Sequence, residues 1–154
     1  PTVLADPTQV HQVMMNLCTN AAQAMEDERG TVEVFLDEIR VERDRWIHQG
    51  NLKPGRYVRL RIRDTGKGIP LEVQDQVFEP YFTTKKAGQG TGLGLSVVYG
   101  IVQECGGGID LESEVGKGTA FTVYFPAAAS EETEPVRVHQ APLPTGREHI
   151  LICG

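Results

Sequence analysis

Apolar residues recur at three- and four-residue spacing from Val10 to Met25, which predicts one amphipathic helix near the start of the chain. Asp6 precedes Pro7, so an N-cap and a proline at the first helical position mark where this helix begins. Gly30 is a plausible stop. A second amphipathic pattern predicts a helix over residues 92–105, and a short helix is expected over residues 70–77.

Strict alternation of apolar and polar residues predicts strands between these helices. Residues 31–37 place Val32, Val34 and Leu36 on one face, and residues 57–64 place Val58, Leu60 and Ile62 on one face. A turn at residues 51–55 makes the two strands an antiparallel hairpin with a long connection. Residues 109–113 and 119–125 form two further strands around a glycine-rich turn.

The chain of 154 residues divides unevenly. Residues 1–126 alternate helix and strand patterns, residues 127–147 have the composition of a linker, and residues 148–154 contain a short apolar run. The net charge of −6 does not suggest binding to nucleic acid, which favours a basic face. No apolar run approaches the length of a membrane span. We therefore expect a cytoplasmic domain without direct membrane contact.

Glycines alternate along Gly90–Leu95, directly before an apolar helix pattern. A flexible loop that leads into a helix N-terminus can bind phosphate through free N–H groups, although such a loop is often only a turn. Lys85 and Lys86 precede it and are either solvated charges or phosphate contacts.

Three polar side chains have both an ordinary and a functional interpretation. Asn16 and Asn20 lie four residues apart on one helix face, either partly solvated or offering amide oxygens to a hard cation. Asp64 shares the parity of the apolar residues of its strand and therefore points toward the core. It either caps the turn at Thr65–Gly68 or accepts a hydrogen bond from a ligand's amino group.

Four ordered motifs resemble the N, G1, F and G2 boxes of sensor histidine kinases: Asn16-Leu-Cys-Thr-Asn20, Asp64-Thr-Gly-Lys-Gly68, Phe78-Glu-Pro-Tyr-Phe82 and Gly88-Gln-Gly-Thr-Gly-Leu-Gly94. The resemblance covers residues 1–126 and extends to the GHKL superfamily. It implies the Bergerat fold, a two-layer α/β (α+β) sandwich whose mixed, mostly antiparallel sheet is covered on one face by helices. No Lys-Ser/Thr pair follows the glycines, which excludes a P-loop.

The resemblance also implies roles for individual residues. Asp64 would accept from the adenine amino group, and Asn20, supported by Asn16, would coordinate Mg²⁺ that bridges the phosphates of ATP. Asn16 and Lys85 are the candidate catalytic residues. The remaining nucleotide contacts would be residues of the adenine site, the lid hinge and the phosphate loop: Gly66, Gly68, Ile69, Thr119, Tyr81, Phe82, Gly90, Thr91, Gly92, Leu93, Gly94 and Leu95.

Asn16 stands where hydrolysing members of the superfamily carry a glutamate base, so phosphotransfer to a histidine is favoured over hydrolysis. The alternatives are a GHKL-type ATPase or chaperone-like switch and a pseudo-kinase interaction module. We expect the histidine-bearing dimerisation domain upstream of Pro1, so the chain alone would not autophosphorylate. The expected further partner is a response regulator. Residues 146–153 resemble the entry to a receiver domain of a hybrid kinase, or form a short apolar tail.

Overall fold

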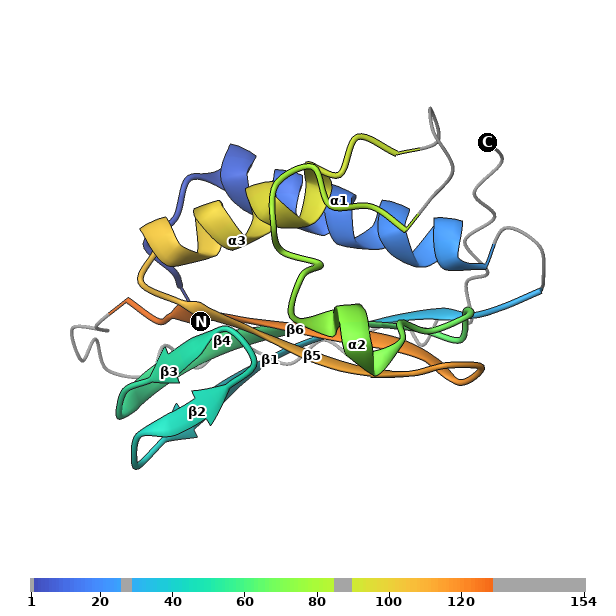
Figure 1. Cartoon of the computed structure of the whole chain (residues 1–154). Coiled ribbons are helices and arrows are strands. Elements are labelled where there is room, and N and C mark those ends of the chain that lie inside the picture. The colour runs from blue at the N-terminus through green and yellow to red at the C-terminus, as the bar shows by residue number, and fades with distance from the viewer. Residues whose placement is uncertain (1, 26–28, 85–89, 129–154) are drawn as a thin grey trace, which may run out of the picture.

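A four-stranded sheet with two long helices on one face forms the body of the molecule (Figure 1). The structure, a computed structural model, describes residues 2–25, 29–84 and 90–128. Lys85 and Lys86, the expected linker beyond residue 128 and the apolar run at residues 148–154 lie outside the described residues. The elements are α1 (Pro7–Ala24), β1 (Val32–Val41), β2 (Arg45–Ile47), β3 (Gly50–Leu52), β4 (Gly55–Asp64), α2 (Leu71–Gln74), α3 (Gly94–Glu104), β5 (Gly108–Glu114) and β6 (Gly118–Pro126).

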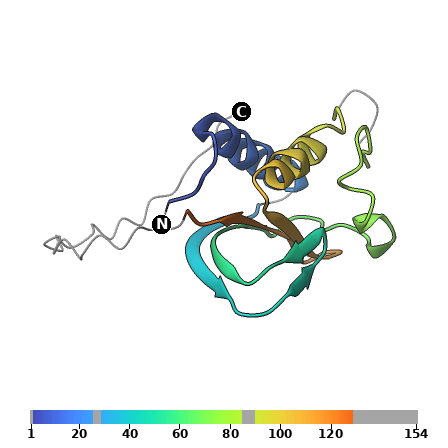
Figure 2. The same ribbon diagram turned by 90° about the vertical axis from the view of Figure 1, so that its left-hand side faces the viewer.

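The sheet has the strand order β1-β4-β6-β5, and α1 and α3 lie together across one of its faces (Figure 2). This arrangement confirms the predicted two-layer α/β sandwich. Every pairing among the described strands is antiparallel, so this part of the sheet is not mixed as the resemblance implied. The register places Asp64, the last residue of β4, beside Thr119 of β6.

The core lies between the helices and the sheet, as the apolar patterns predicted. Its members come from every layer: Val13 and Leu17 on α1, Val98 and Val102 on α3, Leu60 and Ile62 on β4, and Phe121 and Val123 on β6. Full burial of one such side chain contributes about 1.5–3 kcal/mol. Burial of the alternate apolar side chains of β4 therefore stabilises one orientation of the strand. In that orientation Asp64 faces the core side.

Helix α1 begins where the sequence predicts but ends earlier. The Asp6 carboxylate accepts a hydrogen bond from the Thr8 N–H at 2.7 Å, which satisfies one of the free N–H groups of the first turn. The helix ends at Ala24, because Met25 leaves helical geometry with φ −113° and ψ 9°. Gly30 is therefore not the stop. A Cβ there would lie 2.2 Å from the Met25 sulfur, so this glycine provides space for that side chain.

Strand β1 differs from the expectation in length and in burial. It continues to Val41, and it is an edge strand. Of the apolar face predicted for residues 31–37, Val32 packs against the core, whereas Val34 and Leu36 are 48% and 67% exposed in the described structure. The antiparallel pairing of β1 with β4 is confirmed.

A small β2–β3 hairpin occupies the connection between β1 and β4. Asn51 and Leu52 belong to β3 and not to a turn, and Leu52 is buried with Tyr57 and Tyr124 on the side of the sheet away from the core helices. Trp46 of the hairpin is 81% exposed. The hairpin therefore gives the sheet a second, smaller core.

The short helix α2 covers residues 71–74 and not 70–77. None of the helices in the described ranges is long and apolar enough to cross a membrane.

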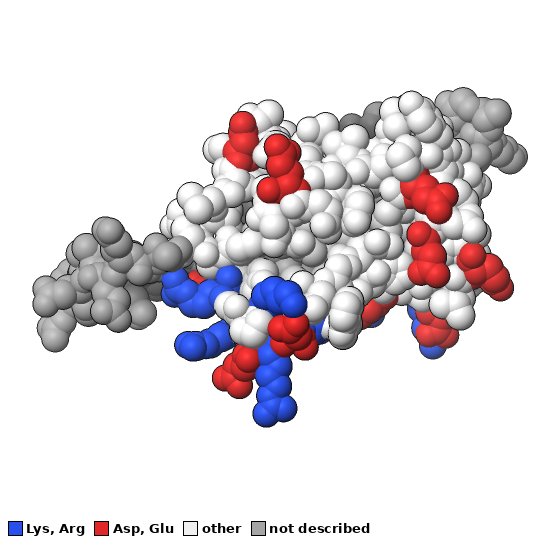
Figure 3. Space-filling model, turned by 60° about the vertical axis from the view of Figure 1, so that its left-hand side comes forward, with Lys and Arg blue, Asp and Glu red and all other residues white. Residues whose placement is uncertain are grey.

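Basic and acidic side chains lie next to one another along the lower part of the face shown in Figure 3. Arg59 binds Asp37 through Nε at 2.8 Å, and Arg61 binds Glu112 at 2.6 Å. These two arginines of β4 are therefore paired with acids, and the face shown does not form a continuous basic surface of the kind that nucleic acid requires.

Candidate functional site

A cleft of about 570 Å³ lies between the two long helices and the end of the sheet. It has two ends, formed by different elements. The sheet end contains Asp64, Gly68, Ile69 and Thr119. The helix end contains Asn16 and Asn20 of α1 together with the described loop and first turn at Gly90, Thr91, Gly92, Gly94 and Leu95. Motifs up to a hundred residues apart in the sequence thus meet around one cavity.

Asp64 is the carboxylate at the sheet end, where Lys67 also lines the cleft. The side chain is only 3% exposed, and one carboxylate oxygen, Oδ1, accepts the Gly66 N–H at 2.8 Å and the Thr119 N–H at 3.3 Å. Burial raises the pKa of this carboxyl, and the two backbone hydrogen bonds oppose that rise. Both protein contacts go to Oδ1, so within the described residues Oδ2 keeps its capacity for a ligand in the cleft. Asp64 thus both caps the turn and offers an acceptor.

Glycines bring the backbone close together around Asp64. Gly68 has φ +73°, and a Cβ on it would lie 2.2 Å from the Glu114 carbonyl oxygen. Gly118 has φ +111°, and its Cβ would lie 2.0 Å from the Asp64 carbonyl oxygen. Side chains are thus excluded sterically and conformationally at both positions, and Gly68 contributes only backbone to the wall of the cleft.

At the helix end, the two asparagines of α1 reach the cleft from one helix face. The Asn16 Nδ2 donates to the Gly94 carbonyl at 3.3 Å, which ties α1 to the first turn of α3. This bond leaves the Asn16 amide oxygen available. Asn20 is half-buried and also lines the cleft. Amide oxygens are suitable ligands for Mg²⁺, which needs few protein ligands when water and phosphate oxygens complete its shell.

The first turn of α3 presents backbone N–H groups at the same end. No side chain caps the helix at Leu93, so these donors are available to an anion. The preceding loop is held in place, because the Tyr81 N–H donates to the Gly92 carbonyl at 2.9 Å. Gly92 has φ +67°, and a Cβ on it would lie 2.5 Å from the Tyr81 carbonyl carbon.

Not every predicted site residue lines the cleft. Phe82 does, whereas Tyr81 is 77% exposed and contributes its backbone. Gly66 contributes through its N–H to Asp64, and Leu93 is the cap position of α3.

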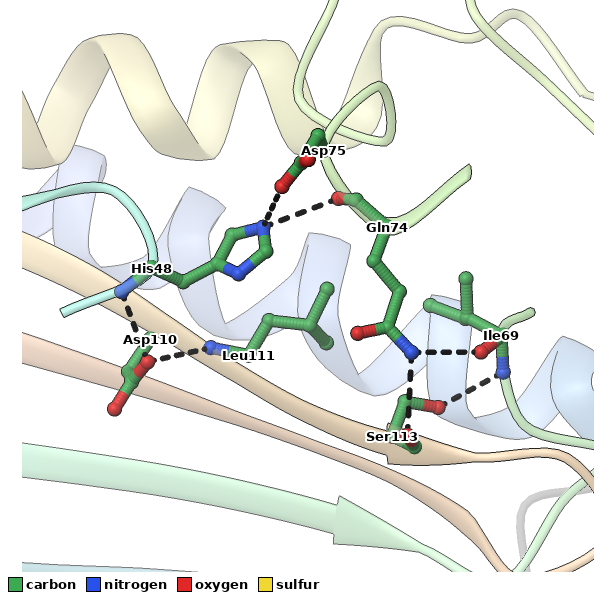
Figure 4. Close-up of polar contacts among 7 residues, drawn as sticks. All are labelled: His48, Ile69, Gln74, Asp75, Asp110, Leu111 and Ser113. Atoms are coloured by element: carbon green, nitrogen blue, oxygen red, sulfur yellow. Dashed lines mark hydrogen bonds and ion pairs between the residues drawn. The ribbon is translucent and has the colours of Figure 1, made fainter. Parts of the chain in front are cut away.

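Two polar residues that support the sheet end were missed in the sequence. The buried Gln74 Nε2 donates to the carbonyls of Ile69, at 2.8 Å, and of Ser113, at 3.1 Å (Figure 4). The Ile69 N–H donates to Ser113 Oγ at 2.8 Å. Both backbone groups of Ile69 are therefore held by side chains. The sequence alone gives no signal for either residue, because their contacts depend on the register of β5 with β6 and on the path of the loop through Ile69.

A third missed residue, His48, joins the hairpin to α2. Its Nε2 lies 3.2 Å from the Gln74 carbonyl oxygen and 3.3 Å from Asp75 Oδ1, and its backbone N–H donates to Asp110 at 3.1 Å (Figure 4). The second small core is thereby fastened to the segment that follows Ile69.

Comparison with known proteins gives a consistent family. Residues 5–129 match the family model described as histidine kinase-, DNA gyrase B-, and HSP90-like ATPase. The chain is 45% identical over 130 residues to the sensor kinase CckA of Brucella abortus, covering 84% of this chain and 14% of CckA. Among solved structures, a mycobacterial sensor histidine kinase, MprB, is similar with a TM-score of 0.62 and 29% identity, covering 80% of this chain and 74% of that one. ShkA in complex with AMPPNP is similar with a TM-score of 0.60 and 27% identity, covering 84% of this chain and 24% of ShkA.

Proposed function

Since the chain belongs to the family of histidine kinase-, DNA gyrase B- and HSP90-like ATPases and is related to sensor histidine kinases, we propose that it binds Mg-ATP in its cleft and donates the γ-phosphate to a histidine of a dimerisation domain. The observation that carries the proposal is the convergence of three features on one cavity. These are the buried acceptor Asp64, the amide pair on α1 and the uncapped start of α3.

At the sheet end, the base of the nucleotide lies against Gly68 and Ile69, and its amino group donates to Asp64. Two properties support this assignment: Oδ2 of the carboxylate has no partner among the described residues, and Gly68, which has no side chain of its own, lines the cleft. A hydrogen bond to a charged acceptor contributes about 1.5–3 kcal/mol. Thr119, beside Asp64 in the register, completes this end.

At the helix end, the phosphates lie against the first turn of α3, with Lys85 as a further contact from outside the described residues. Asn20 would hold Mg²⁺ through its amide oxygen, and Asn16 would support the metal or its water shell. When bound, Mg²⁺ neutralises phosphate charge and orients the chain of phosphates. The half-buried amides on one face of α1 fit this metal, because they supply hard oxygen without adding negative charge.

Transfer to a protein histidine is favoured over hydrolysis by the chemistry of Asn16. A general base for water must take up a proton, and an amide cannot do so at neutral pH. An imidazole nucleophile needs less activation than water. The competing candidate, a GHKL-type ATPase switch, would require another base in the cleft.

The partners belong to the proposal as well. The chain spans 14% of the length of CckA and 24% of that of ShkA, so both relatives contain further segments. We expect this chain to act on a histidine-bearing dimerisation domain, with a response regulator or a receiver domain as the next phosphate acceptor.

The test combines this chain and γ-labelled ATP with a panel of separately prepared dimerisation segments, with Mg²⁺ or with EDTA. The expected product is acid-labile, base-stable phosphate on one histidine, formed only with Mg²⁺. Asp37→Asn, which removes an exposed carboxylate of β1, is the control that should keep full transfer. Release of inorganic phosphate at an equal rate without any segment would instead support the ATPase.

A further inference from the structure

The hydroxyl of Ser113 uses its full hydrogen-bonding capacity, although the residue does not line the cleft. Ser113 lies on β5 opposite Thr119 of β6. Its Oγ lies 2.8 Å from the Ile69 N, 3.1 Å from the Gly118 carbonyl oxygen and 2.9 Å from Thr119 Oγ1. A serine hydroxyl has one proton to donate and two lone pairs that accept. The three contacts therefore use the one proton and both lone pairs of the Ser113 hydroxyl.

Only one arrangement of protons makes all three contacts attractive. The Ile69 N–H can only donate, and the Gly118 carbonyl can only accept. Ser113 must therefore donate its proton to Gly118, and its second lone pair must accept the proton of the Thr119 hydroxyl. With that proton directed at Ser113, Thr119 Oγ1 has only lone pairs left for a ligand in the cleft.

The ionised carboxylate of Asp64, like Thr119 Oγ1, can only accept hydrogen bonds from a ligand. Its Oδ1 is occupied by two backbone donors, and its Oδ2 can only accept. Asp64 and Thr119 are neighbours in the register of β4 and β6. Two side chains at the sheet end thus present acceptors side by side.

We propose that Ser113 is a positioning residue that makes Thr119 an acceptor, so that the cleft selects a base with an amino group over one with a carbonyl at the same position. The inference rests on the proposed function, because it assumes a purine nucleotide at the sheet end. Adenine and hypoxanthine provide the comparison: adenine has a 6-amino donor, and hypoxanthine has a 6-oxo acceptor and a proton on N1.

Gln74 provides an internal control for loosening of the loop. It holds the carbonyls of Ile69 and Ser113 but does not contact the Ser113 hydroxyl (Figure 4). Gln74→Leu should therefore weaken binding of both bases by the same factor. Tyr57→Phe, which removes a hydrogen bond to the Lys53 carbonyl in the second core, controls for loss of stability away from the cleft.

The experiment measures the Kd of Mg-ATP and of Mg-ITP by calorimetry for the full chain and its variants. In Ser113→Ala the Thr119 hydroxyl can turn and donate, so the preference for ATP over ITP should fall about fivefold, as expected for one neutral hydrogen bond. Ser113→Thr keeps a hydroxyl and should restore the preference. In a Thr119→Val background, Ser113→Ala should leave the preference unchanged.

The possible outcomes separate the two proposals. If the unmodified chain binds neither nucleotide, the proposed function fails. If it binds ATP but Ser113→Ala raises both Kd values equally, Ser113 only supports the loop and the inference is overturned. If Ser113→Ala does not fold, Ser113→Cys provides the comparison, because a thiol is a weak donor and acceptor.

Discussion

Replacement of Asp64 by asparagine should separate nucleotide affinity from stability. The side chains are nearly identical in shape, and the asparagine oxygen can still accept the N–H groups of Gly66 and Thr119, which now go to Oδ1. The amide NH₂ then stands where Oδ2 stands in the native protein. A donor would face the donor that the proposed adenine presents.

The expected loss of affinity follows from the contact that is removed. A hydrogen bond to a charged group contributes about 1.5–3 kcal/mol, which corresponds to a Kd raised about 10- to 150-fold. The free energy of unfolding should be unchanged or higher in the variant. Burial raises the pKa of the Asp64 carboxyl, so its ionisation opposes folding, and a neutral amide avoids that cost.

The sign of the pH dependence follows from the raised pKa. The Asp64 carboxyl binds its proton more tightly in the folded state than in the unfolded state. The contribution of the protonated carboxyl to the free energy of unfolding is therefore fully present below its ordinary pKa of 3.8. It is lost as the pH rises through the higher, folded-state pKa. The Tm difference between Asp64→Asn and the unmodified chain should therefore shift in favour of the variant over that window.

Calorimetry for ATP and thermal melts at a series of pH values measure both effects, with Asp37→Asn as the control. Asp37 is exposed, and its partner Arg59 holds its pKa below the usual range, so its replacement should leave ATP affinity unchanged. Unchanged affinity in Asp64→Asn would refute the adenine contact. Equal losses of affinity in the two variants would point to net charge as the cause.

Four other substitutions test the cleft and the fold. Asn20→Ala should abolish the Mg²⁺ dependence of ATP binding; titrations with and without the metal that still differ as in the unmodified chain would contradict the metal assignment. Gly118→Ala should destabilise by about 3 kcal/mol or more, because its Cβ would lie 2.0 Å from the Asp64 carbonyl oxygen. Gly116→Ala, with open space around its Cβ, should cost about 1–2 kcal/mol in denaturant melts, and equal losses would refute the steric argument. Gly100→Ala, in α3 with nothing within 4 Å, should stabilise by about 0.8–1 kcal/mol, seen as a higher Tm.

Local patterns predicted those parts of the fold whose cause is local. Asp64 was placed on the core side by strand parity alone, and it is 3% exposed. The N-cap at Asp6 is also predictable from the sequence, because a cap depends on a few consecutive residues. Alternation failed for Val34 and Leu36 because it assigns residues to a face without showing whether anything covers that face. Their strand lies at the sheet edge, and both side chains are exposed.

Features that depend on pairing between distant segments were not predictable. The β2–β3 hairpin has strands of three residues each, too short to show a period, and Asn51 was assigned to a turn. Ser113 and Gln74 carry no signal in one sequence, because their partners are defined only by the register of β5 with β6 and by the path of the loop through Ile69. Whether a polar residue orients a site depends on its neighbours in space, which a single sequence does not show.

The two ends of the cleft are held in place by different contacts. Substitutions at the two ends should therefore affect different properties of nucleotide binding. At the sheet end, the geometry is fixed by the close backbone approach at Gly118 and by the hydrogen bonds of the Ser113 hydroxyl. At the helix end, a hydrogen bond of 3.3 Å from Asn16 joins α1 to the Gly94 carbonyl in the first turn of α3. Loss of that bond leaves the acceptors of the sheet end in place. Under both proposals, replacement of Asp64 or Ser113 should therefore change the preference among bases, whereas replacement of Asn16 or Asn20 should change metal dependence and phosphate transfer at constant base preference.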